Sequence, residues 1–316
     1  MKRVLLCVIA VLLIAALVMF LVPSSVPVAF GDELPAYRPV TLTHPDPEPI
    51  PLDAATPYAP HAGGWLPFNR GYEDGTISVR IEAYMIDGTI CWFAWVQIAD
   101  ASQIRTTSWR KYPSKQEAFV TAMAEREKGV LTISGDWCVS RTEGVVIRNG
   151  KTLRKARATY YDCMFIDANG DMHVLTAPVA NNYDDFDGEI MHSFVFGPAL
   201  VKDGEMLTDF NERGMRLVGG SKKTERVVLC QMGPLSYLII CTEGPDQSWD
   251  KSGGFTIPRM AEICHSLGAQ QAFNLDGGSS AWLVLGTERL NAVDGKKRTI
   301  TDAIVFITAE PDPAAP

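Results

Sequence analysis

A short polar stretch near the C-terminus, residues 273–285 (FNLDGGSSAWLVL), carries the residue types best suited to chemistry. An apolar run up to Leu275 is followed by Asp276, two glycines and two serines, and a second apolar run begins at Trp282. Paired glycines allow positive φ and let a ligand approach the main chain closely. A carboxylate beside hydroxyls and N–H groups could therefore bind a phosphorylated or sugar-like ligand. The alternative is a polar β-turn in which Asp276 bonds to its own backbone.

Metal-binding patterns in the sequence are weak. The cysteines and histidines show no Cys-x-x-Cys motif and no zinc-site spacing. Residues 167–171 (DANGD) begin like a calcium loop, but the remaining ligands are absent, so a hairpin turn is favoured. In the acidic loop 183–189 (YDDFDGE) a divalent ion is conceivable, although a solvated loop is the favoured interpretation. We predict no metal site and no cofactor, and leave a divalent ion open.

Charge and composition exclude one class of function. The chain of 316 residues has a formal net charge of −8. Non-specific nucleic-acid binding needs a basic surface that displaces counterions, so no nucleic-acid partner is predicted. Hydrophobic residues make up 47% of the chain and charged residues 21%, which is ample for a globular core.

The N-terminus is predicted to insert into a membrane. Lys2 and Arg3 precede an apolar run over residues 4–22, which at ~1.5 Å per residue just spans a hydrocarbon core of about 30 Å. Because flanking basic residues stay cytoplasmic, everything after the run is expected outside the cell. We predict a transmembrane signal anchor over 1–22 and a single-pass protein of the cell membrane, bound through 4–22. A cleaved signal peptide is the alternative, although residues 23–29 offer a poor cleavage site.

The rest of the chain divides into three parts. Residues 23–62 are rich in proline, which predicts an extended extracellular stalk with few side chains worth burying. The folded domain is expected over 63–310, and the tail 311–316 is expected to fray.

Six cysteines follow Cys7 and would face an oxidising exterior. Cys230 and Cys241 flank a predicted hairpin turn and could pair across it, whereas free cysteines would serve as small buried side chains. The sequence leaves both states open.

The elements expected in the domain are mostly strands joined by tight turns. Asp-Gly and Asn-Gly between apolar runs are hairpin signals, and such turns are predicted at 87–88, 149–150, 169–170 and 203–204. One helix is expected to begin at Ser114, where Glu117 would complete a capping box. A second is expected over 256–267 and ends at Gly268. The chain thus predicts an α+β fold with a mixed, largely antiparallel β-sheet core, two or three flanking helices and one preceding transmembrane helix.

Several motifs, taken in order, resemble those of the phosphodiester glycosidase family. That family includes the domain of the lysosomal enzyme that uncovers mannose 6-phosphate by removing N-acetylglucosamine, and many bacterial exported proteins. The likeness covers about residues 77–307 and is carried by an ordered set of segments: 89–107, 134–137, 144–150, 192–201, 253–267, 274–278, Asn291 and 298–303. The resemblance implies a hydrolase that cleaves the C1–O bond of sugar-1-phosphodiesters.

The chain departs from the family's pattern at several positions. Ser134 stands where the family has Asn, and only Arg226 remains of its Pro-Arg-Thr-Ala-Ile-Gly element. Residues 243–245 (EGP) replace Asp-Gly-Arg and lose a cation, and Ala281 replaces a serine. The family's substrate preference therefore does not carry over directly, and its activity could be reduced or altered.

The bond to be broken and the resemblance together suggest catalytic groups. The departing phosphate monoester is already an anion, so the reaction needs a carboxylate at C1 more than a strong acid. Asp276 is the first choice for this carboxylate, with Glu243 or Asp136 as the second. His192 could donate a proton, although a lone histidine near a strand is often structural.

The same argument suggests groups that hold the phosphate. Arg226 and Arg298 are candidates because arginine makes bidentate contacts to oxyanions, although either could be a surface charge. Backbone and hydroxyl donors would come from Gly277, Gly278 and Ser280, while Asn274 would orient a sugar hydroxyl or Asp276.

We expect a membrane-tethered extracytoplasmic hydrolase of cell-wall or exopolysaccharide metabolism, acting on a glycosyl phosphodiester or a phosphate-containing polysaccharide. One alternative is a non-catalytic carbohydrate or wall-polymer binding protein on the same fold. Another is a metal-dependent phosphodiesterase that cleaves P–O, which the lack of clustered His and Asp ligands disfavours.

Overall fold

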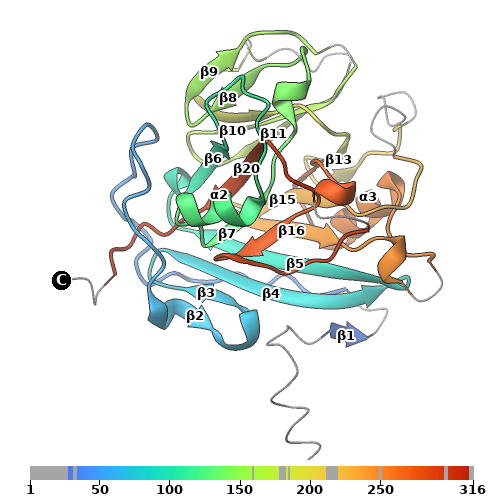
Figure 1. Cartoon of the computed structure of the whole chain (residues 1–316), viewed down its shortest axis with the longest axis horizontal. Helices are drawn as coiled ribbons and strands as arrows, with labels where there is room; N and C mark the ends of the chain where they lie inside the picture. Colours follow the sequence, from blue (N-terminus) through green and yellow to red (C-terminus); the bar gives the residue numbers. More distant parts are fainter. Residues whose placement is uncertain are drawn as a thin grey trace, which may run out of the picture.

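The computed structural model describes residues 28–30, 34–158, 160–177, 183, 186–210, 220–248, 251–294 and 298–312 (Figure 1). Over these ranges the chain forms mostly antiparallel β-sheets and two α-helices, which confirms the predicted α+β class. The predicted anchor 1–22 lies outside the described residues. Within the described ranges, no helix combines the length and apolar character needed to cross a membrane.

The larger sheet contains ten strands. Two of the predicted turns, 87–88 and 203–204, join neighbouring strands of this sheet; Asp87 and Gly88 both adopt positive φ (48° and 73°) between two ten-residue strands. In spatial order the strands are β14 (Glu205–Met206), β13 (Ala199–Lys202), β17 (Gln271–Asn274), β15 (Val227–Gly233), β16 (Ser236–Thr242), β5 (Thr89–Ile98), β4 (Ile77–Ile86), β3 (Gly71–Glu73) and β2 (Trp65–Leu66), with β1 (Val28–Phe30) parallel to β4.

A five-stranded sheet shares a core with the larger one. Phe273 and Leu229 of the larger sheet belong to the same buried cluster as Ile133, Ile304 and Phe306 of the smaller. In spatial order its strands are β19 (Glu288–Arg289), β18 (Leu283–Leu285), β7 (Leu131–Ser134), β20 (Asp302–Phe306) and β6 (Ile104–Ser108).

Two small sheets lie at one end of the molecule (top of Figure 1). They comprise β11 (Met172–Leu175), β10 (Cys163–Asp167) and β12 (Ile190–Phe194), and the hairpin of β8 (Val146–Arg148) and β9 (Lys151–Arg154). The turns predicted at 149–150 and 169–170 connect these strands as expected.

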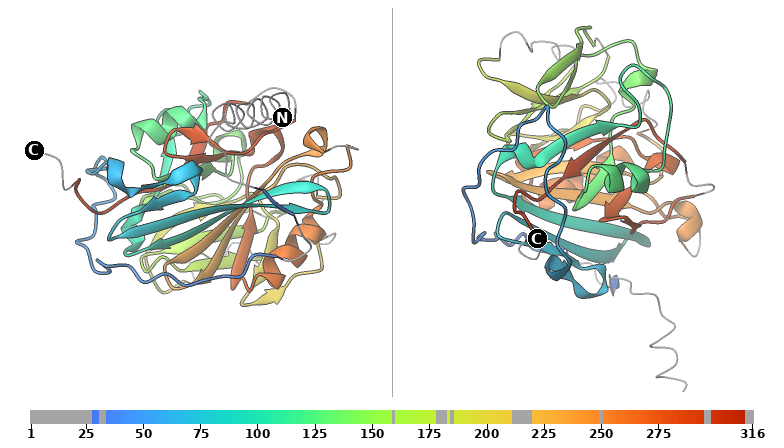
Figure 2. Two further views of the ribbon diagram at one scale, coloured as in Figure 1. Left: turned by 90° about the horizontal axis from the view of Figure 1, so that it is seen from below. Right: turned by 60° about the vertical axis from the view of Figure 1, so that its left-hand side comes forward.

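The helix α3 (Ile257–Ser266) confirms the second predicted helix. Thr256 caps it by accepting a hydrogen bond from the backbone N–H of Arg259 (3.4 Å), and Gly268 follows it with φ 83°. It packs on the outer face of the larger sheet, so α3 and α2 lie on opposite sides of that sheet (Figure 2).

The start predicted for the first helix is wrong. The helix α2 (Val120–Arg126) begins six residues after Ser114 and has no side-chain cap. Ala118 instead forms an antiparallel bridge with Ile300, which holds the preceding residues extended, and Glu117 accepts a hydrogen bond from Thr299 (2.7 Å). The capping pattern was present, but a tertiary strand contact decided the local conformation.

The described part of the proline-rich segment, 34–62, runs along the outside of the domain (Figure 2). Ile50 is buried, its N–H donates to the hydroxyl of Ser102 (2.8 Å), and Arg105 donates to its carbonyl (3.2 Å). Tyr37 lies 2.8 Å from the hydroxyl of Ser236. The segment thus contacts the domain at Ile50 and Tyr37. The boundary at residue 63 and the role as a stalk stay predictions, and residues 313–316 of the tail lie outside the described ranges.

The Cys230–Cys241 disulfide, which the sequence left open, does not form. Cys230 is opposite Leu238 in the β15–β16 ladder and Cys241 is opposite Val227, so the two side chains face different cores. All six cysteines from Cys91 onward are buried and free, and the Sγ atoms of Cys230 and Cys264 lie 3.8 Å apart.

Candidate active site

The stretch singled out in the sequence connects the two main sheets. Its first strand, β17, lies in the larger sheet and its second, β18, in the smaller one, so 275–282 is a crossing between layers and not a hairpin. The backbone N–H of Asp276 donates to the carbonyl of Gly135 (3.1 Å), and that of Gly278 donates to Glu225 (3.0 Å). A Cβ on Gly277 would lie 2.7 Å from the Glu225 carbonyl oxygen, and Gly278 has φ 58°. Close backbone packing therefore requires glycine at 277, and the positive φ favours glycine at 278.

Asp276 has the electrostatic surroundings of a reactive carboxylate. Its side chain is half-buried, and burial raises its pKa to about 6, with Asp136 adding to the rise. The hydroxyl of Ser280 and the charges of Arg298 and Arg141 act against that rise. A carboxyl with this pKa is ionised at neutral pH yet less completely solvated than a surface aspartate, which suits a base or nucleophile.

The sequence analysis missed Arg141. It is half-buried, follows a short 3₁₀ turn over Cys138–Ser140, and its charge reaches both Asp276 and Asp136. Its guanidinium lies 4.5 Å from the ring centroids of both Tyr161 and Phe196. Those rings come from distant segments, so no local spacing pattern could have identified the arrangement.

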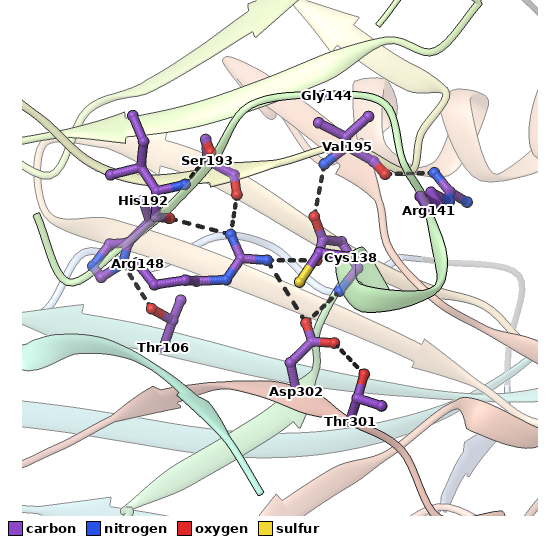
Figure 3. Close-up of polar contacts among 12 residues, drawn as sticks. Thr106, Cys138, Arg141, Gly144, Arg148, His192, Ser193, Val195, Thr301 and Asp302 are labelled. Carbon is purple, nitrogen blue, oxygen red and sulfur yellow. Dashed lines mark hydrogen bonds and ion pairs between the residues drawn. The ribbon is translucent and has the colours of Figure 1, made fainter. Parts of the chain in front are cut away.

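Asp136, a second candidate for the carboxylate, is fully buried in an ionic network (Figure 3). One of its carboxylate oxygens accepts from Arg148 (2.5 Å) and the other from the N–H of Val195 (2.8 Å). Its own N–H donates to Asp302 (3.0 Å), which also lies 3.8 Å from Arg148. Both oxygens of the buried Asp136 carboxylate therefore accept hydrogen bonds from other described residues, which places this residue in the scaffold.

The same network contains the one group of potential metal ligands found in the described ranges. Asp136, Cys138 and Asp302 place their ligand atoms within 4.8 Å of one another. Arg148 supplies the positive charge there, and burial together with the Asp136 charge raises the pKa of Asp302. A guanidinium thus already pairs with both carboxylates of the donor set. Part of the acidic loop 183–189, where an ion was conceivable, lies outside the described residues.

His192 is also held in the interior. Its Nδ1 accepts from the N–H of Asn149 (3.3 Å) and lies 3.2 Å from the hydroxyl of Thr106, while Nε2 faces the carbonyl of Ile104 (3.2 Å). Burial, together with the charge of Arg148, lowers its pKa to about 3. Both nitrogens are engaged and the ring is neutral, so this geometry does not present a proton donor to Asp276.

Glu243 and Arg226 are buried next to the turn. Glu243 accepts from the indole N–H of Trp92 (3.2 Å) and the N–H of Ala292 (3.3 Å), and burial raises its pKa. The guanidinium of Arg226 donates to the carbonyls of Phe255 (2.9 Å) and Lys222 (2.8 Å), and burial lowers its pKa to about 10. Their polar atoms serve the scaffold in this arrangement.

The remaining predicted residues surround Asp276. Arg298 is exposed, its charge acts on Asp276, and its carbonyl accepts from the indole of Trp282 (3.0 Å). Asn274 is buried, and its amide donates to the carbonyl of Gly197 (2.8 Å). The structure therefore brings together six of the ten predicted residues, namely Asp276, Gly277, Gly278, Ser280, Asn274 and Arg298, and adds Arg141.

Comparison with known proteins is consistent with this geometry. The family model for phosphodiester glycosidases matches residues 121–307, and the chain belongs to that family. An uncharacterized SPbeta prophage-derived protein of Bacillus subtilis, YomE, is 28% identical over 204 residues, which are 61% of this chain and 30% of that protein. The chain thus spans under a third of the length of this relative.

A solved structure shares the fold. The catalytic domain of zebrafish N-acetylglucosamine-1-phosphodiester α-N-acetylglucosaminidase, auto-inhibited by its pro-peptide, superposes with a TM-score of 0.58 at 14% sequence identity. The match covers 79% of this chain and 86% of that domain. At this identity the likeness establishes the fold and leaves the substrate to be argued from the site.

Proposed function

We propose that the protein hydrolyses the C1–O bond of sugar-1-phosphodiesters, with Asp276 as the carboxylate that acts at C1. The observation that carries this proposal is Asp276 itself. It is a half-buried carboxyl with a pKa raised to about 6, followed by Gly277 and Gly278 and surrounded by the charges of Arg298 and Arg141. Membership of the phosphodiester glycosidase family supports the same reaction class.

The geometry suits a leaving group that is already anionic. An ordinary glycoside needs a second carboxyl group to protonate the departing oxygen. Asp136 is paired with Arg148 and is not free to act as that acid, while Glu243 accepts from Trp92 and Ala292 through its Oε1. A phosphate monoester leaves without strong acid assistance, and one active carboxylate together with oxyanion donors then suffices.

In the proposed reaction, ionised Asp276 attacks C1 or activates a water molecule that attacks C1. The C1–O bond breaks, its electron pair stays on the phosphate oxygen, and hydrolysis yields the free sugar and a phosphate monoester. Activity should therefore rise with pH through about 6, where Asp276 loses its proton.

We also propose that residues 4–22 tether this hydrolase to the cell membrane with the domain outside, where phosphate-containing wall polymers or exopolysaccharides would be its substrates. The uninterrupted apolar run supports this location. Detection of the domain by protease accessibility on intact cells would test it, and protection of the domain would contradict it.

The activity test uses the full chain in detergent with a panel of sugar-1-phosphodiesters, and free sugar is detected by mass spectrometry. Asp276→Asn should abolish release of sugar while the fold is retained. Asp203→Asn makes the same isosteric change at an exposed turn and should be fully active. Turnover by Asp276→Asn would overturn the assignment.

A non-catalytic carbohydrate-binding protein is the second candidate. The sequestration of Glu243 favours it, because a carboxyl next to the turn is withdrawn into the scaffold. Binding of sugar polymers without release of sugar from any member of the panel would support this candidate.

A further inference from the structure

Arg141 lies in a frame of aromatic rings. The guanidinium carbon is 4.5 Å from the ring centroids of Tyr161 and Phe196 and 6.0 Å from that of Trp137. The guanidinium also donates to the carbonyl of Val195 (Figure 3). Stacking on aromatic faces fixes the plane of the guanidinium and leaves its edge to bind a ligand.

Among the described residues, the charge of Arg141 has no direct counter-ion. In the ranges described above, no carboxylate oxygen lies within 4.0 Å of its nitrogens, whereas Arg148 pairs with both Asp136 and Asp302. Burial accordingly lowers the pKa of Arg141, although the group stays protonated. A half-buried cation without a paired anion is costly unless an anion arrives to complete it.

The segment that carries Arg141 is rigid and strained. Trp137 has φ 57°, which is a rare conformation for a bulky residue and is costly unless its surroundings enforce it. Just before Trp137, the N–H of Asp136 donates to Asp302, and the carbonyl of Gly135 accepts from the N–H of Asp276. Strain of this kind is typical of sites whose geometry must be set before the ligand binds.

Asp276 and Arg141 therefore share one frame. The N–H of Asp276 bonds to Gly135, and Arg141 follows the turn that Gly135 begins, with its N–H directed at the carbonyl of Cys138 (3.4 Å). The Arg141 charge acts directly on Asp276. An anion held by Arg141 would consequently have a defined position relative to the carboxylate.

We propose that Arg141 is the oxyanion-binding residue of the site and takes the phosphate group of the ligand, in place of Arg226. This inference deepens the proposed function and rests on it for the identity of the complete substrate. The binding step itself involves no reaction: two guanidinium N–H groups donate to two phosphate oxygens.

The test measures binding of inorganic phosphate to the full chain by calorimetry. Arg141→Met keeps the apolar stem between the rings and removes the charge, and it should weaken phosphate binding about ten- to a hundred-fold. Arg141→Lys keeps the charge but loses the bidentate guanidinium, and its phosphate affinity should lie between those of the wild type and Arg141→Met. Arg80→Met removes the same charge from an exposed pair with Glu73 and should bind like the wild type. Equal affinity of the wild type and Arg141→Met would overturn the proposal.

A second measurement needs no variant and covers the case in which Arg141→Met fails to fold. Phenylglyoxal modifies accessible arginines, and peptide mapping of the wild-type protein locates the modified residues. Phosphate should protect Arg141 selectively, and unchanged labelling of Arg141 at saturating phosphate would contradict the proposal. Neither measurement depends on turnover. If the wild type releases no sugar but Arg141→Met loses phosphate binding, the anion site is upheld and the hydrolase is rejected. If the wild type releases sugar but Arg141→Met binds phosphate as tightly as the wild type, only the anion site is rejected.

Discussion

Two groups of aspartates and arginines are connected through Gly135 and Asp136, and they differ in how their charges are satisfied. In the buried network, Arg148 pairs with Asp136 at 2.5 Å and with Asp302 at 3.8 Å, and backbone N–H groups complete both carboxylates. In the turn at 276–280, the charges of Arg298 and Arg141 act on Asp276, but within the described ranges neither forms a salt bridge with it.

This difference separates scaffold from site. Burying a closed ionic network costs desolvation free energy, and the network in turn fixes the local geometry. All its charges are already paired, so none remains to bind a ligand. Charges that are brought near one another and left unpaired retain that capacity, and the rest of the fold must stabilise them. The two groups should therefore respond differently to mutation and to pH.

Arg148→Met should have the largest effect on stability. It leaves Asp136 and Asp302 buried without a cation, so the free energy of unfolding should fall by about 3–5 kcal/mol. Urea denaturation measures this loss. The control Arg80→Met breaks the exposed pair with Glu73 and should cost about 0–1 kcal/mol. If the two variants lost the same amount, the network would not be the scaffold described above.

His192 makes a pH-dependent contribution from the scaffold side. Its folded pKa is about 3 and its ordinary value 6.5, so the unfolded chain takes up the proton first as the pH falls, and stability is lost below pH 6.5. At about 1.4 kcal/mol per pH unit, moving from pH 6.5 to 5 should cost about 2 kcal/mol. Asp276 and Asp302 have raised pKa values, so they increase stability as the pH falls, and they do so equally in the wild type and in His192→Gln. The difference in free energy of unfolding between the wild type and His192→Gln, measured by urea denaturation at the two pH values, isolates the contribution of the histidine. If the free energy of unfolding changed equally with pH in the two proteins, the buried neutral state of His192 would be contradicted.

Asp276→Asn should stabilise the protein at neutral pH. The folded pKa of Asp276 is about 6 and its ordinary value 3.8, so its stabilising contribution is complete below pH 3.8 and is lost as the pH rises to about 6. The shift corresponds to about 3 kcal/mol, and half-exposure reduces the expected gain to about 1–2 kcal/mol at pH 7. The gain should vanish near pH 4. If Asp276→Asn were less stable than the wild type at pH 7, Asp276 would be a paired carboxylate like Asp136 and Asp302.

Arg298→Met should have the smallest effect. Its charge lowers the pKa of Asp276, and it is exposed to solvent that screens it. Removing it should move the acidic midpoint of the activity profile upward by a fraction of a pH unit and leave stability unchanged. A pH-rate profile of sugar release measures this shift, and a downward shift would contradict the assigned direction.

Much of the fold could be predicted from local signals. The Asp-Gly and Asn-Gly turns, the strand pairs they join and the capped helix α3 depend on near neighbours in the chain, and the structure confirms them. The predicted start of α2 was wrong because a bridge between Ala118 and Ile300 decided it, and the register of β15 against β16 decided the state of Cys230 and Cys241 that the sequence had left open. Tertiary contacts of this kind leave no local pattern.

The site was predictable only in its glycine turn. Asp276, Gly277 and Gly278 are contiguous, and the requirement for glycine can be inferred from the sequence. The sequence could not separate Asp136 and His192 from Asp276, because residue type does not reveal whether a charge has a partner. Arg141 was missed for the same reason, since its aromatic frame combines the nearby Trp137 with Tyr161 and Phe196 from two distant segments.

The most direct test of the central claim is hydrolysis of a sugar-1-phosphodiester by the full chain in ¹⁸O-labelled water. Attack at C1 must place the label in the released sugar and leave the phosphate monoester unlabelled, and we predict this result, with none of it in Asp276→Asn. Label in the phosphate would mean cleavage of the P–O bond, and it would contradict the assignment of Asp276 as the carboxylate that acts at C1.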